Sequence, residues 1–279
     1  MKKINRRSFL AAAGLTAAAL ALTACGGSPS SVASSVASSA ASSEAASTSA
    51  AAGELTTVEA GKLTMATNAA FPPYEMTTDA GEFEGIDIET AQAIADKLGL
   101  ELQIDDMDFD AALLSVQQGK ADIVMAGVTV TDERKAVMDF SDSYATGIQS
   151  IIVPEGSDIA SPDDLAGKKI GTQRGTTGYI YCSDDFGDEN VVAYDDGLTA
   201  VQALNNGQVD AVVIDNAPAQ EFIAANPGLK ILDTSYAEED YAIGMAKGSS
   251  LEDAVNAALK ELKADGTLQA IVDKYITAE

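Results

Sequence analysis

Short apolar runs alternate with amphipathic stretches along the chain beyond residue 54. The apolar runs have the length of strands and are rich in aliphatic and β-branched residues, and they lie at residues 62–67, 100–104, 122–128, 168–172, 191–194 and 211–214. The amphipathic stretches repeat apolar positions at helical spacing, and they lie at residues 86–98, 109–118, 177–183, 197–206 and 217–225. This alternation predicts an α/β fold in which a parallel sheet is flanked by helices.

Two segments of the chain resemble each other. Residues 116–124 (VQQGKADIV) align without gaps on residues 204–212 (LNNGQVDAV), and in each copy a helix is expected to end at a Gly before a buried strand. The register places Gly127 opposite Asp215, each just beyond the carboxyl end of its strand. Because open α/β sheets bind ligands at that edge, we expect two lobes whose edges face each other across a cleft.

The first 25 residues have the pattern of an export signal. Four basic residues precede an apolar run from Phe9 to Leu22, which is too short to span a membrane comfortably. The run ends in Leu22-Thr23-Ala24-Cys25, which resembles a lipobox. We therefore expect residues 1–25 to be a lipoprotein signal peptide and Cys25 to carry the lipid that anchors the protein to the outer face of a membrane. An uncleaved anchor is the alternative. Residues 5–10 (NRRSFL) also resemble a twin-arginine signal, which leaves the export route open.

Composition limits the possible functions. Residues 26–54 are almost entirely Ser, Ala and Gly, which predicts a flexible linker. The chain has 43 acidic and 17 basic residues, and its net charge of −26 argues against nucleic acid as a partner. It has no His, and its two Cys are Cys25 and Cys182, so the usual general base and zinc ligands are missing. We expect no cofactor, no metal and no catalytic residue, and we expect Cys182 to be a small buried apolar residue.

Six motifs follow one another along the chain: FPPYE (71–75), GIDIE (85–89), TVTDER (129–134), DFSDSY (139–144), GTT (175–177) and DAVVID (210–215). Together they resemble the solute-binding proteins of polar amino-acid ABC importers. The resemblance implies a periplasmic-binding-protein type II fold, in which two Rossmann-like lobes are joined by a hinge that the chain crosses twice. Lobe 1 is then expected at residues 55–146 and 242–279, and lobe 2 at residues 147–241, with the crossings at 144–147 and 239–243. It also implies a monomer that delivers a free amino acid to permease subunits.

A zwitterionic amino acid needs a cation with two parallel donors for its carboxylate, and the planar fork of Arg134 fits that need. Arg134 also lies at the start of a short helix, where N–H groups add affinity for anions. A surface ion pair with Asp132 or Glu133 is the alternative. The resemblance implies that further groups help to hold the carboxylate, namely Thr129, the backbone of Gly127, Thr176 and Thr177.

The remaining candidates would bind the ammonium group and the side chain of the ligand. Asp215 is expected to accept hydrogen bonds from the α-ammonium group, although a helix N-cap is an ordinary role for Asp at this position. The resemblance places Phe71 and Phe109 as aromatic walls of the cleft, with core packing as the alternative. It places Asn68 and Gln173 at the distal end of the ligand. Since relatives that select cationic amino acids often have an acid at the first of these positions, the neutral Asn68 favours an uncharged polar ligand such as glutamine.

Three other functions are compatible with the sequence. A dehydratase-type enzyme on the same fold would need paired catalytic groups, and Asp215 has no evident acidic partner. An adhesin lipoprotein or an amino-acid sensor would also suit a tethered module at the cell surface. A thermal-shift screen with amino acids separates these functions, because a carrier or sensor is stabilised without turnover and an adhesin is not.

Overall fold

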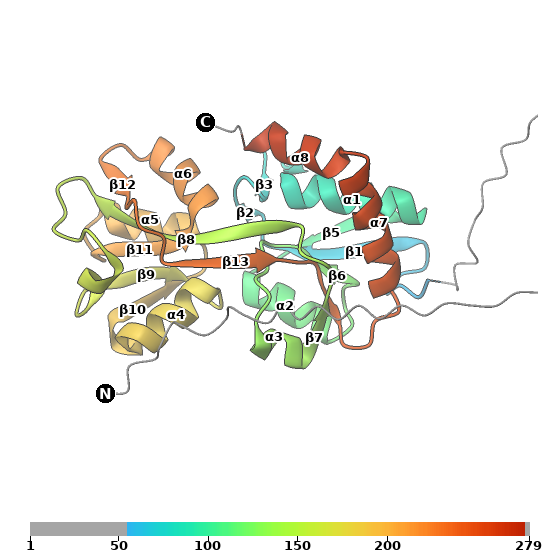
Figure 1. Cartoon of the computed structure of the whole chain (residues 1–279), viewed down its shortest axis with the longest axis horizontal. Helices are drawn as coiled ribbons and strands as arrows, with labels where there is room; N and C mark the ends of the chain where they lie inside the picture. The colour runs from blue at the N-terminus through green and yellow to red at the C-terminus, as the bar shows by residue number, and fades with distance from the viewer. Residues whose placement is uncertain (1–54, 277–279) are drawn as a thin grey trace, which may run out of the picture. The chain divides into compact units, whose positions relative to one another are not determined.

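The computed structural model describes residues 55–276, which form two lobes (Figure 1). The predicted signal peptide with Cys25 and the predicted linker at 26–54 lie outside the described residues. The first lobe contains a sheet of order β5-β1-β6-β14-β7, with β1 (Lys62–Thr67), β5 (Glu101–Asp106), β6 (Ile123–Val124), β7 (Met138–Phe140) and β14 (Gly244–Ala246). Strand β1 pairs in parallel with β5 and β6, whereas β14 is antiparallel to β6 and β7.

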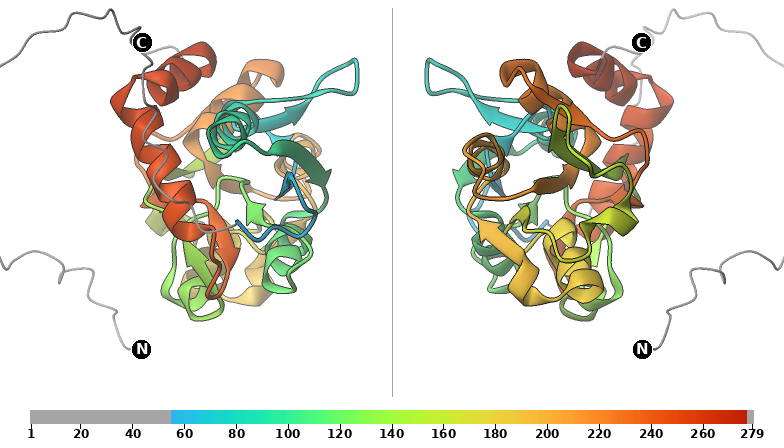
Figure 2. Two further views of the ribbon diagram at one scale, coloured as in Figure 1. Left: turned by 90° about the vertical axis from the view of Figure 1, so that its right-hand side faces the viewer. Right: turned by 90° about the vertical axis from the view of Figure 1, so that its left-hand side faces the viewer.

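Helices cover both faces of this sheet, and strand β1 alternates its side chains between them. Leu63 and Met65 pack in the cluster of α1 (Ile86–Leu98), and Ala66 packs in the cluster of α2 (Phe109–Gln117). Helices α7 (Glu252–Ala264) and α8 (Thr267–Tyr275) pack against α1 at one end of the molecule (Figure 2). A small sheet of β2 (Ala70–Phe71), β3 (Glu75–Thr77) and β4 (Phe83–Glu84) and the short helix α3 (Asp132–Val137) complete this lobe.

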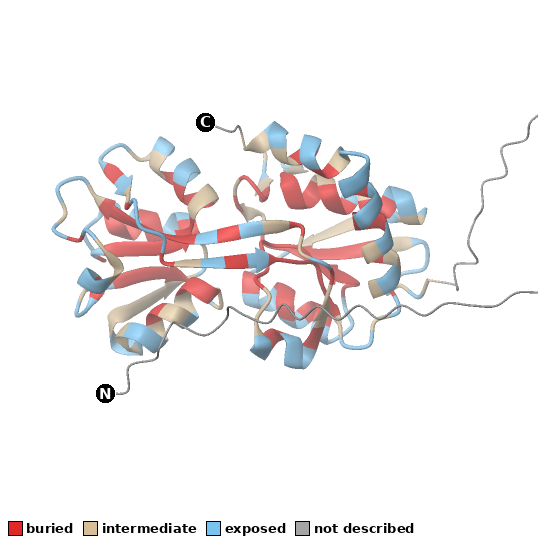
Figure 3. Cartoon of the chain, viewed as in Figure 1, coloured by how far each residue is buried: buried red, intermediate tan, exposed pale blue. Residues whose placement is uncertain are grey.

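The second lobe repeats the plan around a sheet of order β10-β9-β11-β8-β12. Its strands are β8 (Ala145–Pro154), β9 (Ile170–Gln173), β10 (Val191–Tyr194), β11 (Ala211–Asp215), β12 (Leu229–Ile231) and β13 (Ala237–Tyr241), the last paired with β8. Its helices are α4 (Thr177–Phe186), α5 (Gly197–Asn205) and α6 (Asn216–Ala225), with 3₁₀ turns η1 (Pro162–Leu165) and η2 (Asp188–Asn190). In both lobes burial concentrates on the strands and on the inner helix faces (Figure 3).

The structure confirms most predicted elements and corrects two features. The helix at 86–98 is found as predicted and ends at Gly99 in the left-handed conformation. Both sheets are mixed rather than parallel, because β14 and β8 enter their sheets antiparallel to β6 and β11. The strand predicted at 122–128 is paired only at Ile123–Val124, since the chain turns away from the sheet at Gly127, where φ is 55°.

The internal repeat is confirmed in atomic detail. Gly119 and Gly207 follow α2 and α5 with φ of 65° and 67°. Farther along, Asp122 accepts a hydrogen bond from the N–H of Thr64 (2.8 Å), and Asp210 accepts one from the N–H of Lys169 (2.8 Å). In each lobe, the Asp that follows this turn therefore accepts a hydrogen bond from the backbone at or just before the neighbouring parallel strand, β1 for Asp122 and β9 for Asp210.

The chain connects the lobes through a two-stranded ribbon. Strands β8 and β13 pair antiparallel from Ala145 opposite Tyr241 to Gln149 opposite Ala237, and they run from one lobe to the other in Figure 1. A Cβ atom at Gly147 would lie 2.5 Å from the ring of Tyr241, so this position requires glycine. The two crossings are therefore packed against each other.

A further prediction concerns Cys182. Cys182 is fully buried in α4, in the same cluster as Ile170 and Val213, and burial raises the pKa of its thiol to about 12. The burial confirms the prediction of a small buried residue at this position. Within residues 55–276, no helix has both the length and the apolar character needed to cross a bilayer.

Candidate functional site

All ten residues predicted to bind ligand line one pocket between the two sheets. The predicted residues are Asn68, Phe71, Phe109, Gly127, Thr129, Arg134, Gln173, Thr176, Thr177 and Asp215. Glu75 and Ala126, which were not predicted, also line it. The lining comes from the carboxyl ends of β1, β9 and β11 and the loops that follow, which is the expected edge of an α/β sheet.

Arg134 is buried, and its guanidinium group joins the two lobes. It is 8% exposed, and Nη1 donates to the carbonyl of Thr129 (2.8 Å) while Nη2 donates to the carbonyl of Gly175 in the second lobe (3.1 Å). Its position at the start of α3 is fixed by Thr131, whose hydroxyl accepts from the N–H of Arg134 (3.1 Å). Arg134 thus faces the pocket rather than pairing on the surface with its acidic neighbours.

The threonines of the pocket are oriented by a buried acid on β13. The Oε2 atom of Glu239 accepts hydrogen bonds from Thr177 (2.9 Å), Gln149 (3.1 Å) and Thr129 (3.2 Å). Thr176 instead caps α4, because its hydroxyl accepts from the N–H of Tyr179 (3.3 Å). The first N–H groups of α4 therefore lie at the pocket, where helix geometry favours an anion.

Asp215 ends β11 at the opposite side of the pocket. Oδ1 accepts a hydrogen bond from the hydroxyl of Tyr241, and Oδ2 accepts one from Gln149 (2.8 Å). The carboxylate makes no side-chain capping bond to α6, although Asp215 occupies the N-cap position. Burial raises the pKa of Asp215 to about 7, with the hydrogen bond from Tyr241 opposing the rise. A nearby cation would lower this pKa.

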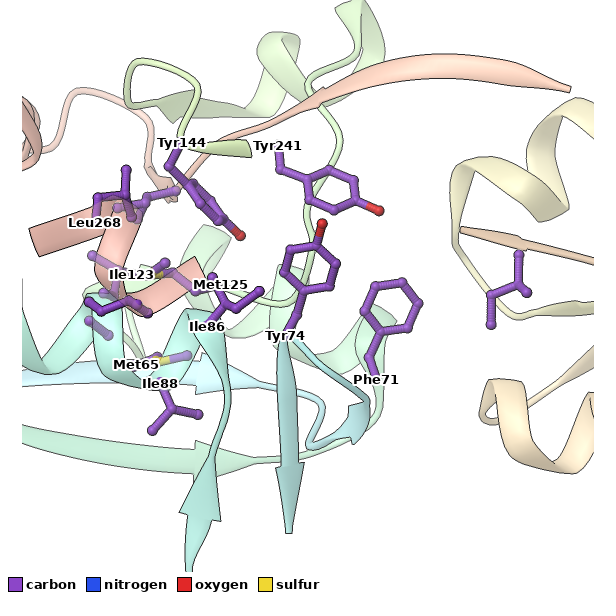
Figure 4. Close-up of a cluster of buried hydrophobic side chains, with 14 of the residues drawn as sticks. Met65, Phe71, Tyr74, Ile86, Ile88, Ile123, Met125, Tyr144, Tyr241 and Leu268 are labelled. Carbon is purple, nitrogen blue, oxygen red and sulfur yellow. The ribbon is translucent and has the colours of Figure 1, made fainter. Parts of the chain in front are cut away.

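Two aromatic side chains lie in the pocket and connect it to the core. The ring of Phe71 stacks on Tyr74 with centroids 5.9 Å apart, and Tyr74 meets Tyr241 edge-on at 5.3 Å (Figure 4). Phe109 begins α2, and its ring lies under the guanidinium group of Arg134 at 5.4 Å. Both phenylalanines are therefore pocket residues and core residues at once.

Asn68 and Gln173 contact each other across the lobes. Nε2 of Gln173 donates to Oδ1 of Asn68 (2.8 Å), and Nδ2 of Asn68 donates to the carbonyl of Met107 (2.9 Å). This bond, like that of Arg134 to Gly175, joins groups of the two lobes directly. The described structure is consequently a closed arrangement.

Several buried polar residues at the pocket were missed from the sequence. Glu75 has no exposed surface, and Asp87 accepts a hydrogen bond from the N–H of Gly127 (3.0 Å), so that N–H does not point at a ligand. Gln149 and Glu239 lie on the ribbon, where they hold Asp215 and the threonines. A single sequence gives little signal for such residues, because an isolated Glu or Gln is usually exposed.

Comparisons with known proteins agree with this geometry. Residues 63–278 match the family described as bacterial extracellular solute-binding proteins, family 3. The chain is 33% identical to the L-cystine-binding protein TcyJ of Escherichia coli (strain K12), over 79% of this chain and 85% of the relative. It is 32% identical to a probable histidine-binding protein of Neisseria gonorrhoeae, over 99% and 98% of the two chains.

A solved structure, an ancestral arginine-binding protein bound to glutamine, is 41% identical, covers 78% of this chain and 99% of its own, and superposes with a TM-score of 0.75. The two-lobed periplasmic-binding-protein type II fold expected from the sequence is thereby confirmed. The chain belongs to the family 3 bacterial extracellular solute-binding proteins, which are binding proteins that act outside the cytoplasm and are not enzymes.

Proposed function

We propose that this chain is the binding component of an amino-acid ABC importer and captures one free amino acid in the pocket between its lobes. The relatives described above are named for cystine, histidine or arginine, and one of them is bound to glutamine. The observation that carries the proposal is the placement of Arg134 and Asp215. Arg134 on helix α3 and Asp215 at the end of strand β11 bring one cation and one carboxylate to a single pocket, which matches a zwitterion.

In this proposal the ligand lies with its α-carboxylate at Arg134 and its α-ammonium group at Asp215. The N-terminus of α4 adds N–H donors near the carboxylate, as Thr176 and Thr177 begin that helix. The ammonium group replaces the proton that burial favours on Asp215. Because the N–H of Gly127 is engaged by Asp87, we assign only its carbonyl oxygen to the ligand, as an acceptor for the ammonium group.

The side chain of the ligand would lie between the rings of Phe71 and Phe109, with Asn68 and Gln173 at its distal end. Both amides are neutral and can donate as well as accept. They therefore suit an uncharged polar side chain such as that of glutamine. On binding, the direct bond between Asn68 and Gln173 is replaced by bonds to the ligand.

Closure of the lobes would signal that the pocket is loaded. We take lobe 1 as residues 55–146 and 242–279 and lobe 2 as residues 147–241, with the ribbon of β8 and β13 as the hinge. A ligand that bridges Arg134 and Asp215 has higher affinity for the closed form, and only such a difference shifts the equilibrium. Permease subunits can then distinguish the loaded protein from the empty one.

The proposal includes a lipid anchor at Cys25, linked to the lobes by residues 26–54. Replacement Cys25→Ser is expected to abolish incorporation of radiolabelled palmitate and to release the protein from the membrane fraction. Unchanged incorporation in this variant would contradict the anchor while leaving amino-acid binding untouched.

The experiment that tests the function is calorimetry of the purified protein with each of the twenty L-amino acids. We expect saturable binding of at least one, without chemical change of the ligand recovered afterwards. At a thousand times its dissociation constant, that ligand should stabilise the protein by about 4 kcal/mol. Binding of none of the twenty would contradict the proposed function.

A further inference from the structure

Glu75 is a buried acid in the pocket to which the proposed binding mode assigns neither the carboxylate nor the ammonium group of the amino acid. It begins β3, is 0% exposed and lines the pocket. No N–H or O–H group of residues 55–276 donates a hydrogen bond to either of its carboxyl oxygens. A buried carboxylate without a donor or a cation is strongly disfavoured. The group therefore needs either a proton or a cationic partner from the ligand.

Asp87, at the start of α1, lies beside it. Oδ2 of Asp87 accepts hydrogen bonds from the N–H of Gly127 (3.0 Å) and the hydroxyl of Tyr144 (2.7 Å), whereas no described group donates to Oδ1. The carboxyl group of Glu75 lies beside that of Asp87, and a hydrogen bond between them would raise the pKa of Glu75 and lower that of Asp87. Two carboxyl groups can form such a bond only when one holds a proton. Because two donors already stabilise Asp87 as an anion, the proton belongs on Glu75.

The surrounding groups favour the same assignment. The groups that interact with the pair are Asp106 of β5, Asp215 of β11, Tyr74 and Tyr144, and Arg134 of α3 lines the same pocket. Burial, and then the negative charges of Asp87, Asp106 and Asp215, raise the pKa of Glu75 well above its ordinary value. Burial also raises the pKa of Asp87 to about 6. Arg134 is engaged by two backbone carbonyls. Burial and the neighbouring negative charges therefore favour the protonated form of Glu75 in the empty pocket.

We propose that Glu75 determines which side chains the pocket accepts, because it binds a neutral side chain while protonated and becomes the counter-ion of a cationic side chain after releasing its proton to the solvent. This inference rests on the proposed function, since Arg134 and Asp215 must hold the two backbone groups of the ligand. Their charges match those of the zwitterion, so the charge of Glu75 must match that of the side chain. Glutamine therefore binds while Glu75 is protonated. An amino acid with a cationic side chain, such as arginine, binds while Glu75 is ionised.

The test is calorimetry with L-arginine and L-glutamine at pH 7, in phosphate and in Tris, which differ in ionisation enthalpy. Asp215 loses its proton equally with both ligands, so the difference between them isolates Glu75. Arginine is expected to release about one proton more than glutamine. The affinity for arginine, relative to glutamine, should rise with pH for as long as Glu75 is protonated in the empty pocket, because arginine binding then requires the loss of that proton. This comparison uses the wild-type protein and depends on no variant.

A pair of variants tests the residue itself. Glu75→Gln keeps the shape of the side chain but cannot ionise, so it should weaken arginine binding relative to glutamine at least tenfold and remove the extra proton. Glu82→Gln changes the charge equally at an exposed position away from the pocket and should alter neither ratio nor proton count.

Equal proton release with both ligands, an unchanged arginine-to-glutamine ratio in Glu75→Gln, or failure of arginine to bind while another amino acid binds would each overturn the role of Glu75 alone. If none of the twenty amino acids binds, the proposed function fails, and the role of Glu75 fails with it.

Discussion

The two lobes use the same helix, turn and strand but end the unit differently at the pocket. In one, α2 leads through Gly119 into β6 and on to Gly127; in the other, α5 leads through Gly207 into β11 and Asp215. The turns match closely in dihedral angle, and both units fasten a neighbouring segment through an Asp. At the pocket, the backbone of the first lobe turns away from the sheet at Gly127, whereas the second lobe has the carboxylate of Asp215 at the corresponding position. The helix, turn and strand are therefore repeated in the two lobes, but the groups that they place at the pocket differ.

This difference decides what each lobe contributes to binding. In the proposed binding mode the first lobe supplies the cation, through Arg134 on a helix with no counterpart in the repeat, and the second supplies Asp215. A ligand needs both charges to satisfy both lobes. The predictions below remove one contribution at a time.

The largest effect is expected for Asp215→Asn. In the proposed binding mode the charge of Asp215 holds the ammonium group, and the amide lacks this charge. A hydrogen bond to a buried charge is among the strongest in proteins. Binding of the ligand found by calorimetry should weaken at least about a hundredfold. The exposed Asp233→Asn in the same lobe is the control and should bind as wild type. Near-normal affinity in Asp215→Asn would contradict the proposal that the second lobe binds the ammonium group through Asp215.

The same carboxylate should make the empty protein less stable as the pH rises. The pKa of Asp215 is about 7 in the folded protein and near 3.8 when unfolded, so the folded state holds a proton that the unfolded state has lost between these values. The contribution is full below pH 4 and is lost as pH rises through 7, on the order of 2 to 4 kcal/mol. Urea unfolding of wild type and Asp215→Asn from pH 4 to 8 measures it. Parallel pH profiles for the two proteins would contradict the assignment.

In the first lobe, Arg134→Lys should weaken binding by about tenfold while leaving stability nearly unchanged. The lysine keeps the charge but loses the planar fork that spans a carboxylate. Arg174→Lys is the matched control, because Arg174 is exposed and lies 3.6 Å from Asp195. Wild-type affinity of the Arg134 variant, measured by calorimetry, would show that the carboxylate is held elsewhere.

The smallest expected effect is a difference in unfolding free energy between variants at the equivalent positions Asp122 and Asp210 of the repeat. Asp122 is buried and accepts hydrogen bonds from the N–H groups of Val58 and Thr64, whereas Asp210 is exposed and accepts one from Lys169. Replacement by Ala should therefore cost about 2 kcal/mol of unfolding free energy at Asp122 and about 1 kcal/mol at Asp210. Chemical denaturation of both variants gives the difference, and the reverse order would contradict this view of the repeat.

The sequence predicted the parts of the fold whose residues repeat locally. Helix 86–98 has a regular apolar face and a terminal Gly, and the two copies of the repeat reinforced each other. The ribbon of β8 and β13 gave no such signal, because its pairing joins residues almost a hundred positions apart. The direction of β14 likewise depends on the return of the chain from the second lobe, which no local pattern contains.

The candidate site likewise contains residues that could be predicted from local motifs and residues whose roles depend on distant contacts. Six of the ten predicted residues stand in motifs that resemble those of the family, and all ten line the pocket. Glu75 stands inside one of these motifs but was not predicted, because its role depends on contact with Asp87 and on complete burial. Glu239 was missed because the ribbon, rather than a local pattern, carries it to the threonines.

The most direct test of the account is the distance between the lobes as the pocket fills. Dyes attached to cysteines introduced at the exposed positions Asp96 and Glu189 report this distance by energy transfer, and the buried Cys182 should not compete for label. We predict that an amino acid that binds increases the closed population with the same midpoint as calorimetry, and that Asp215→Asn shifts that midpoint at least about a hundredfold. Energy transfer that stays constant at saturating ligand would contradict the claim that one amino acid bridges the two lobes.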